Sequence, residues 1–222
     1  MADKNKSIEN EQGNTQKETD SVKEIIGFVL YVLFLIFMVW VIITFVGQRT
    51  VVDGESMENN FHDGESLWVD KISYRFSDPK RFDVVVFPVY DSDYYRASYL
   101  EAGEEIDEDD MDLEEDEKDL FIKRIIALPG ETVRIDDDGS IYVNGTLLEE
   151  NYGKEVITPD NIGRCDEEVT LGDDEYFVMG DNRNASEDSR FYVVGNLKRE
   201  KLVGKAVFRL WPLSKFGPIK KN

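Results

Sequence analysis

Two cations interrupt a strongly apolar run at residues 121–128, FIKRIIAL. If this run is a strand, its side chains alternate between faces, so Lys123 and Arg124 point to opposite sides among apolar neighbours. Burial disfavours the charged form of a lysine and lowers its pKa from ~10.4. Lys123 is therefore placed to lose its proton and act as a base, whereas Arg124 stays charged and needs a carboxylate. The alternative is an edge strand, from which Lys123 would extend its amine into water.

A base needs a nucleophile, and Ser56 in the turn-rich stretch GESMENNFHDGE, residues 54–65, is a candidate. A serine becomes nucleophilic when a neighbouring group takes its proton. His62 is the only histidine, so a Ser-His mechanism would depend wholly on it, and a multi-histidine metal site is excluded. Carboxylates and Lys123 remain as candidate bases. Taken alone, Ser56 is better explained as a turn serine that hydrogen-bonds the backbone.

A third stretch, VMGDNRNASEDSRFYVVGNL at residues 178–197, follows an apolar run with an unusual density of polar groups. Seven of them fall within ten positions: Asp181, Asn182, Arg183, Ser186, Asp188, Ser189 and Arg190. This density predicts a loop held together by its own hydrogen bonds, and an ordinary polar turn is the alternative.

The elements that must position these residues begin with an uncharged apolar run at residues 25–46. A helix of this length spans ~30 Å, the thickness of a bilayer core. The run is long for a signal peptide, and the following GQRTVV contains no A-x-A cleavage pattern, so we expect an uncleaved transmembrane anchor. Lysines concentrate on the side of the polar tail, residues 1–24. This predicts a cytoplasmic N-terminus and an extracytoplasmic domain over residues 47–222.

The predicted external domain contains short runs rich in Val, Ile, Phe and Tyr, separated by turn signals such as DDDGS and NG. The expected strands are SLWVDKI, DVVVFPV, FIKRIIAL, TVRI, SIYVNGTLL, EYFVMG and KAVFRLW. The predicted fold class is all-β, with antiparallel sheets in a sandwich- or barrel-like arrangement. Residues 91–119 hold fifteen acidic and two basic residues, a charge of −13, and are expected to form a solvated insertion loop.

Composition limits the remaining possibilities. The formal net charge of −21 argues against nucleic-acid binding, which needs a basic face. The single cysteine, Cys165, cannot form a disulfide within the chain. The acidic insertion lacks the glycine and the ligand spacing of an EF-hand, and no cofactor or metal is predicted.

Taken together, these three stretches resemble the type I signal peptidases, the Ser/Lys bacterial leader peptidase family. The shared features are Ser56-Met57 shortly after an anchor, Lys123-Arg124 leading to LPG, and the box GDNRNASEDSR at residues 180–190. RFDVVVFPV at residues 81–89 and RLWPLSKFG at residues 209–217 are also similar to family segments. The resemblance covers the chain from the anchor to the end, except for the acidic insertion.

This resemblance implies a membrane-anchored serine endopeptidase that removes signal peptides from secretory preproteins at the outer face of the membrane. Its implied partners are these signal peptides and membrane lipid. Ser56 would be the nucleophile, with its backbone N–H serving the oxyanion, and Lys123 the general base oriented by a hydrogen bond from Ser186. The family pattern implies supporting ion pairs of Arg124 with Asp181 and of Asp188 with Arg190. Candidate walls of the substrate pocket are Met57, Phe61 and Ile122, which core packing would explain equally well.

The chain departs from the family pattern just after the nucleophile. Glu58-Asn59-Asn60-Phe61 stand where the family has x-Pro-Thr-Leu, so the rigid proline is missing. Gly54 occupies a position where some relatives carry a hydroxyl that donates to the oxyanion. Two other readings stay open: a membrane-tethered binding or chaperone domain without catalysis, and the related Ser-Lys self-cleaving repressors. The anchor and the acidic charge argue against the repressors.

Overall fold

The computed structural model describes residues 23–104 and 117–219, so the predicted tail and part of the acidic insertion lie outside the described residues. The chain divides into two compact units, residues 1–46 and 47–222. The described part of the first unit is one helix over Lys23–Val46, whose last turn, Ile42–Val46, is a π-helix. Its side chains are almost all exposed, and its length and composition suffice to cross a membrane.

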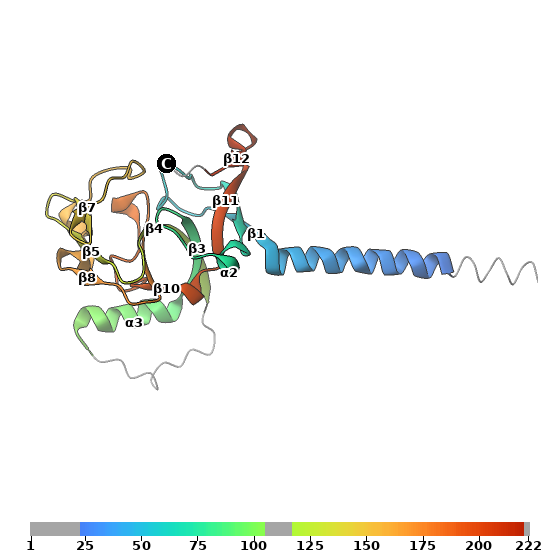
Figure 1. Cartoon of the computed structure of the whole chain (residues 1–222), viewed down its shortest axis with the longest axis horizontal. Coiled ribbons are helices and arrows are strands. Elements are labelled where there is room, and N and C mark those ends of the chain that lie inside the picture. The colour runs from blue at the N-terminus through green and yellow to red at the C-terminus, as the bar shows by residue number, and fades with distance from the viewer. Residues whose placement is uncertain (1–22, 105–116, 220–222) are drawn as a thin grey trace, which may run out of the picture. The chain divides into compact units, whose positions relative to one another are not determined.

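The second unit is built on two antiparallel sheets, as the alternating apolar runs predicted (Figure 1). The larger sheet has the strand order β1-β2-β11-β3-β4-β9-β10, with β12 paired to β11. Its strands are β1 (Gly47–Val51), β2 (Ser66–Asp70), β3 (Val84–Tyr90), β4 (Lys118–Ala127), β9 (Glu175–Met179), β10 (Leu197–Lys198), β11 (Gly204–Trp211) and β12 (Gly217–Pro218).

The smaller sheet has the order β7-β6-β5-β8 and lies at the opposite end of this unit from β11 and β12 (Figure 1). Its strands are β5 (Thr132–Ile135), β6 (Ile141–Val143), β7 (Thr146–Leu147) and β8 (Val169–Thr170). Short helical turns join the strands of both sheets: α2 (Ser73–Phe76), η3 (Pro159–Asn161), η4 (Gly163–Asp166), η5 (Arg183–Ala185), η6 (Arg199–Lys201) and η7 (Leu213–Lys215).

Three apolar clusters form the core. One joins the small sheet to Phe177 and Met179 of β9. A second surrounds the segment after β1 and includes Met57 and Phe61. The third packs β3, β4 and β9 together. The candidate active-site segments therefore sit on a packed frame.

Strand β4 lies inside the large sheet, between β3 and β9. Lys123 is opposite Val85 of β3, while Arg124 is paired with Met179, the last residue of β9. Pairing with β9 begins only at Arg124, so Lys123 has β3 alone beside it. Its side chain is nevertheless 3% exposed and does not extend into water as the edge-strand interpretation required. Because β9 ends beside Arg124, the chain leaves the sheet at Gly180 and forms the polar loop next to Lys123.

The acidic segment differs from its prediction as a loop over residues 91–119. Residues Asp91–Ala102 form the helix α3, and β4 begins at Lys118. The side chain of Asp93 accepts a hydrogen bond from the backbone N–H of Tyr90 at the start of α3, and Gly103 ends it with a φ of 71°. Ala97 is buried in the cluster around β3 and β4, so this helix packs on the sheet.

Candidate active site

Ser56 and Lys123 meet although 67 positions separate them in the sequence. Lys123 Nζ donates a hydrogen bond to Ser56 Oγ at 2.7 Å. Ser56 lies in the turn segment that follows β1, and Lys123 extends from the middle of β4. A hydroxyl and an amine at this distance can exchange a proton directly.

Lys123 is 3% exposed, and its surroundings favour the neutral amine. Burial lowers the pKa of Lys123 to about 8, and the nearby carboxylates of Asp188 and Glu187 offset part of this effect. The Phe121 ring lies 5.0 Å from the amine and adds apolar surface on one side. With this pKa, about a tenth of the amine is unprotonated at pH 7, far more than in an unperturbed lysine, and this neutral form is the one a general base requires.

A groove of about 640 Å³ contains Ser56 and Lys123 in its lining. Residues 48–51 of β1 form part of its wall, and residues 119–123 of β4 form another part. Ile122 lines this groove, as expected for a substrate-pocket residue. The pair is thus accessible to an extended peptide, while the amine itself stays shielded from water.

Met57 and Phe61 do not line this groove, in contrast to the sequence interpretation. Both side chains are almost fully buried, at 0% and 1% exposure, and pack in the core with Leu67 and Val69. Their apolar character is explained by the need to fix the segment around Ser56 to the sheet. His62 is exposed and is likewise outside the groove lining.

The polar loop holds the backbone of the serine segment. The backbone N–H of Asn182 donates to the carbonyl of Ser56 at 3.0 Å, and Asn182 Nδ2 donates to the carbonyl of Glu55 at 3.1 Å. Gly180 lies so close that a Cβ there would overlap Ser186 Oγ and the Ser56 carbonyl oxygen. Residues 55 and 56 are therefore fixed against the end of β9 by main-chain contacts that need a glycine at position 180.

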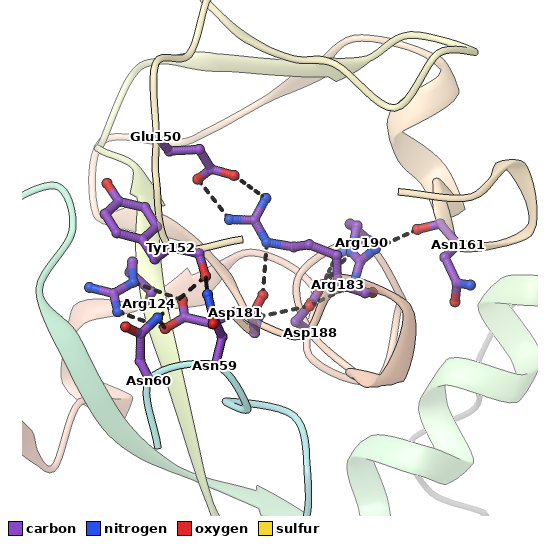
Figure 2. A network of polar contacts seen from close by, with 11 residues as sticks. Asn59, Asn60, Arg124, Glu150, Tyr152, Asn161, Asp181, Arg183, Asp188 and Arg190 are labelled. Atoms are coloured by element: carbon purple, nitrogen blue, oxygen red, sulfur yellow. Dashed lines mark hydrogen bonds and ion pairs between the residues drawn. The ribbon is translucent and has the colours of Figure 1, made fainter. Parts of the chain in front are cut away.

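Arg124 and Asp181 form a buried ion pair on the far side of β4 from the lysine amine. Arg124 Nε and Nη2 donate to the two oxygens of Asp181 at 2.8 and 2.6 Å. Both side chains are buried, and the Tyr152 ring lies 4.2 Å from the guanidinium carbon. Asp181 also accepts from Asn60 Nδ2 at 2.9 Å (Figure 2).

A second buried pair organises the polar loop internally. Arg190 Nε donates to Asp188 Oδ1 at 2.8 Å, and both residues are 0% exposed. Burial raises the pKa of Asp188, but Arg190, the Gly180 N–H and Lys123 together outweigh this effect, so the pKa of this carboxyl lies below its usual value. Arg190 also donates to the carbonyl oxygens of Asn161 and Arg183, as Figure 2 shows. The stretch with seven polar residues therefore forms a loop held by its own hydrogen bonds, as the sequence predicted.

Ser186 contacts Asp188 in this structure, not the lysine. Its Oγ donates to Asp188 Oδ2 at 2.8 Å, and the same oxygen accepts from the backbone N–H of Gly180 at 3.0 Å. Among the described residues, the hydrogen bond of the Lys123 amine goes to Ser56. The hydrogen-bond partner of Ser186 is thus Asp188, a carboxylate whose charge favours the protonated form of the Lys123 amine. The direct orienting contact predicted from the family pattern is absent from this geometry.

Some residues of the site carried no recognisable signal in the sequence. Tyr152 lies in a stretch between predicted strands, yet its carbonyl accepts hydrogen bonds from Asn59 Nδ2 and Asn60 Nδ2 at 3.2 and 3.3 Å. Glu150, in the same stretch, accepts a hydrogen bond from Arg183 Nη2 of the polar loop at 2.7 Å. The one feature of the sequence that pointed to these contacts was the pair Asn59-Asn60, which departs from the family pattern. Within residues 23–104 and 117–219, no cluster of three or more His, Cys, Asp or Glu side chains could hold a metal ion.

Comparison with known proteins connects this geometry to a family. A family model described as signal peptidase, peptidase S26, matches residues 23–211. A probable signal peptidase I-2 of Synechocystis sp. is 38% identical over 174 residues, covering 78% of this chain and 67% of that protein. The signal peptidase I of Leptolyngbya laminosa is 36% identical over 176 residues, covering 79% and 74%. A crystal structure of a signal peptidase I from Enterococcus faecalis V583 aligns with 58% of this chain and 97% of that chain, at 29% identity and a TM-score of 0.38.

The family model and the curated relatives class this protein as a serine peptidase, a hydrolase. The chain belongs to the signal peptidase family, peptidase S26. This membership favours the enzyme over the two alternatives left open by the sequence, the non-catalytic binding or chaperone domain and the self-cleaving repressors.

Proposed function

We propose that this protein removes signal peptides from exported preproteins, with Ser56 as nucleophile and Lys123 as general base. The observation that carries the proposal is the 2.7 Å contact of Lys123 Nζ with Ser56 Oγ in a peptide-sized groove. Relatives that cover most of this chain are named signal peptidase I, which supports the choice of substrate.

The chemistry follows from the two side chains. The neutral amine of Lys123 takes the proton of Ser56 Oγ as the oxygen attacks the scissile carbonyl carbon. The resulting ammonium then gives this proton to the departing amine of the mature protein, and the signal peptide remains as an ester on Ser56. A water molecule, deprotonated by the same amine, attacks the ester and restores the hydroxyl. In this proposal the backbone N–H of Ser56 donates a hydrogen bond to the oxyanion that develops on the scissile carbonyl.

An extended peptide fits the groove as an added strand. β1 stands at one end of the strand order of the large sheet, and residues of both β1 and β4 line the groove. Main-chain hydrogen bonds to such a strand provide affinity, and alternate side chains enter pockets. Ile122 supplies one apolar wall, and an apolar wall suits the small residues that resemblance to the family leads us to expect before the cleaved bond.

Anchoring in the cell membrane completes the proposal. The helix Lys23–Val46 would span the bilayer, with the N-terminus cytoplasmic and residues from Gly47 onward outside. The support is the uncharged run at residues 25–46 and the surplus of lysine before it. Lipid around this helix is the proposed membrane partner.

The test is cleavage of a secretory preprotein by the full-length protein in lipid vesicles, with the product identified by its N-terminal sequence. Wild type should release the mature protein at a site preceded by small residues, and Ser56→Ala should release none while remaining folded. Protease added outside spheroplasts should digest the domain beyond residue 50. Cleavage by Ser56→Ala would refute the proposed nucleophile, and protection of the domain would refute the proposed topology.

A further inference from the structure

The Ser56 segment of this chain lacks the rigid proline of its family. In its place are the hydrogen bonds of Asn59 and Asn60 to the Tyr152 carbonyl and of Asn60 to Asp181, which we call the clamp. Asn59 and Asn60 occupy the positions of the proline and the threonine. Both side chains donate to the carbonyl oxygen of Tyr152, which belongs to the connection between β7 and β8 of the small sheet. Two segments about 90 positions apart in the chain therefore meet three to four residues beyond Ser56.

Asn60 is the junction of this clamp. Its Nδ2 donates to the Tyr152 carbonyl at 3.3 Å and to Asp181 Oδ2 at 2.9 Å, so both amide hydrogens are used. Asp181 in turn holds Arg124, the neighbour of Lys123 on β4. Asn60 thus joins the strand that carries the base to the segment that carries the nucleophile, through one buried carboxylate (Figure 2).

The distance between Ser56 and Lys123 depends on this junction. On one side of Ser56, Asn182 fixes the carbonyl oxygens of residues 55 and 56. On the other side, Asn60 fixes the chain to Asp181, the residue just before Asn182. A displacement of ~1 Å in a catalytic pair costs on the order of 100-fold in rate, so a fixed segment is a kinetic requirement.

We propose that Asn60 is a positioning residue, which holds the Ser56 segment at catalytic distance from Lys123 by bridging Asp181 and the Tyr152 carbonyl. The inference rests on Ser56 being the nucleophile. It assigns to this chain's asparagine pair the stiffening that the family obtains from proline. The exposed ion pair of Lys154 with Glu58 joins the same two segments, but solvent screens it, and it contributes little to the clamp.

The experiment compares Asn60→Leu, Asn60→Thr and the matched control Lys154→Met in the full-length protein, with steady-state cleavage of a preprotein in lipid vesicles. Leucine keeps the side-chain volume and removes both hydrogen bonds, so kcat should fall by about 10- to 100-fold with KM within about twofold of wild type. Threonine keeps one hydroxyl donor and should recover part of this loss. Lys154→Met should match wild type.

Hydrogen exchange of the amides of residues 57–61 gives a second readout that does not require catalysis. In Asn60→Leu these amides should exchange at least tenfold faster than in wild type, while the amides of β3 and β9 stay unchanged. Unchanged kcat and exchange in a folded Asn60→Leu variant would overturn the inference and leave the proposed function intact. Full cleavage by Ser56→Ala would instead remove the proposed function itself.

Discussion

Gly180 and Ser186 are in van der Waals contact in a way that leaves no room for a side chain at position 180. A Cβ there would overlap Ser186 Oγ and the carbonyl oxygen of Ser56. Position 180 follows the end of β9, and the Ser56 segment and the polar loop both approach its backbone there. Only glycine, which has no Cβ, leaves room for both.

Gly180→Ala is expected to reduce kcat by roughly 100-fold or more, because the Ser56 segment must shift away from Lys123 to make room. The measurement is preprotein cleavage, with circular dichroism as the check on folding. Gly195→Ala is the matched control: Gly195 lies five residues beyond the polar box, and a Cβ there would meet its nearest atom at 3.6 Å, so its φ of 57° costs backbone strain without displacing the Ser56 segment. Equal activity of both alanine variants would contradict the close packing.

The backbone conformation of Asn59 predicts that proline, the residue that the family carries at this position, would destabilise this chain. Asn59 has a φ of 93°, whereas proline holds φ near −65°. Asn59→Pro should therefore lower the free energy of unfolding by ~3 kcal/mol or lose the fold around Ser56. Asn59→Gly should change it by less than about 1 kcal/mol, since glycine adopts positive φ freely and only the bond to Tyr152 is lost. Denaturant unfolding of the two variants decides, and a stable, active Asn59→Pro would disprove the expected backbone conformation.

Helix α3 is expected to contribute to stability despite its acidic sequence. Ala97→Asp would place a carboxylate in the core cluster of β3 and β4, at a cost of about 2 kcal/mol or more. Ser98→Asp adds the same charge at the exposed neighbouring position and should cost less than about 0.5 kcal/mol. Thermal unfolding in detergent measures both. Equal melting temperatures would show that α3 does not pack on the sheet.

Lys123 should destabilise the fold at neutral pH. Its pKa is about 8 in the folded protein and 10.5 in an unperturbed lysine, a difference that corresponds to ~3 kcal/mol. The cost is complete below pH 8, where the buried amine carries a proton, and it fades as pH rises to about 10.5. Lys123→Met should therefore be inactive yet more stable than wild type at pH 7, with the advantage shrinking above pH 8. If Lys123→Met is less stable than wild type at pH 7, the burial of the charged Lys123 amine does not destabilise the fold, which contradicts the lowered pKa.

The strands and the burial of Lys123 could be predicted from the sequence because they depend on local patterns. Alternating apolar runs predicted β3, β4, β5 and β9 to within a few residues, and a lysine in an apolar strand indicated a shifted pKa. Resemblance to the family then implied that Ser56 and Lys123 act together, and Lys123 Nζ lies 2.7 Å from Ser56 Oγ in the structure.

The remaining features depend on long-range contacts that no local pattern encodes. α3 was not predicted because the helix is polar and has only one buried residue, Ala97, so its sequence lacks the apolar periodicity of an amphipathic helix. Tyr152 joins the site through its carbonyl, which every residue type possesses. The partner of Ser186 was wrong because Asp188, two positions away, competes for the same hydroxyl. Met57 and Phe61 were candidate pocket walls by resemblance to the family, with core packing as the equal alternative, and their membership of a buried apolar cluster favours core packing.

The pH dependence of kcat/KM for preprotein cleavage tests the central claim most directly, because it reports the ionisation of the base in the free enzyme. With Lys123 as base and a pKa of about 8, kcat/KM should rise about tenfold per pH unit below pH 8 and level off above it. His62→Ala should give the same profile, and Lys123→Ala and Lys123→Arg should show no cleavage at any pH. A wild-type plateau reached already near pH 6.5, or cleavage retained in Lys123→Ala, would contradict the lysine-base mechanism.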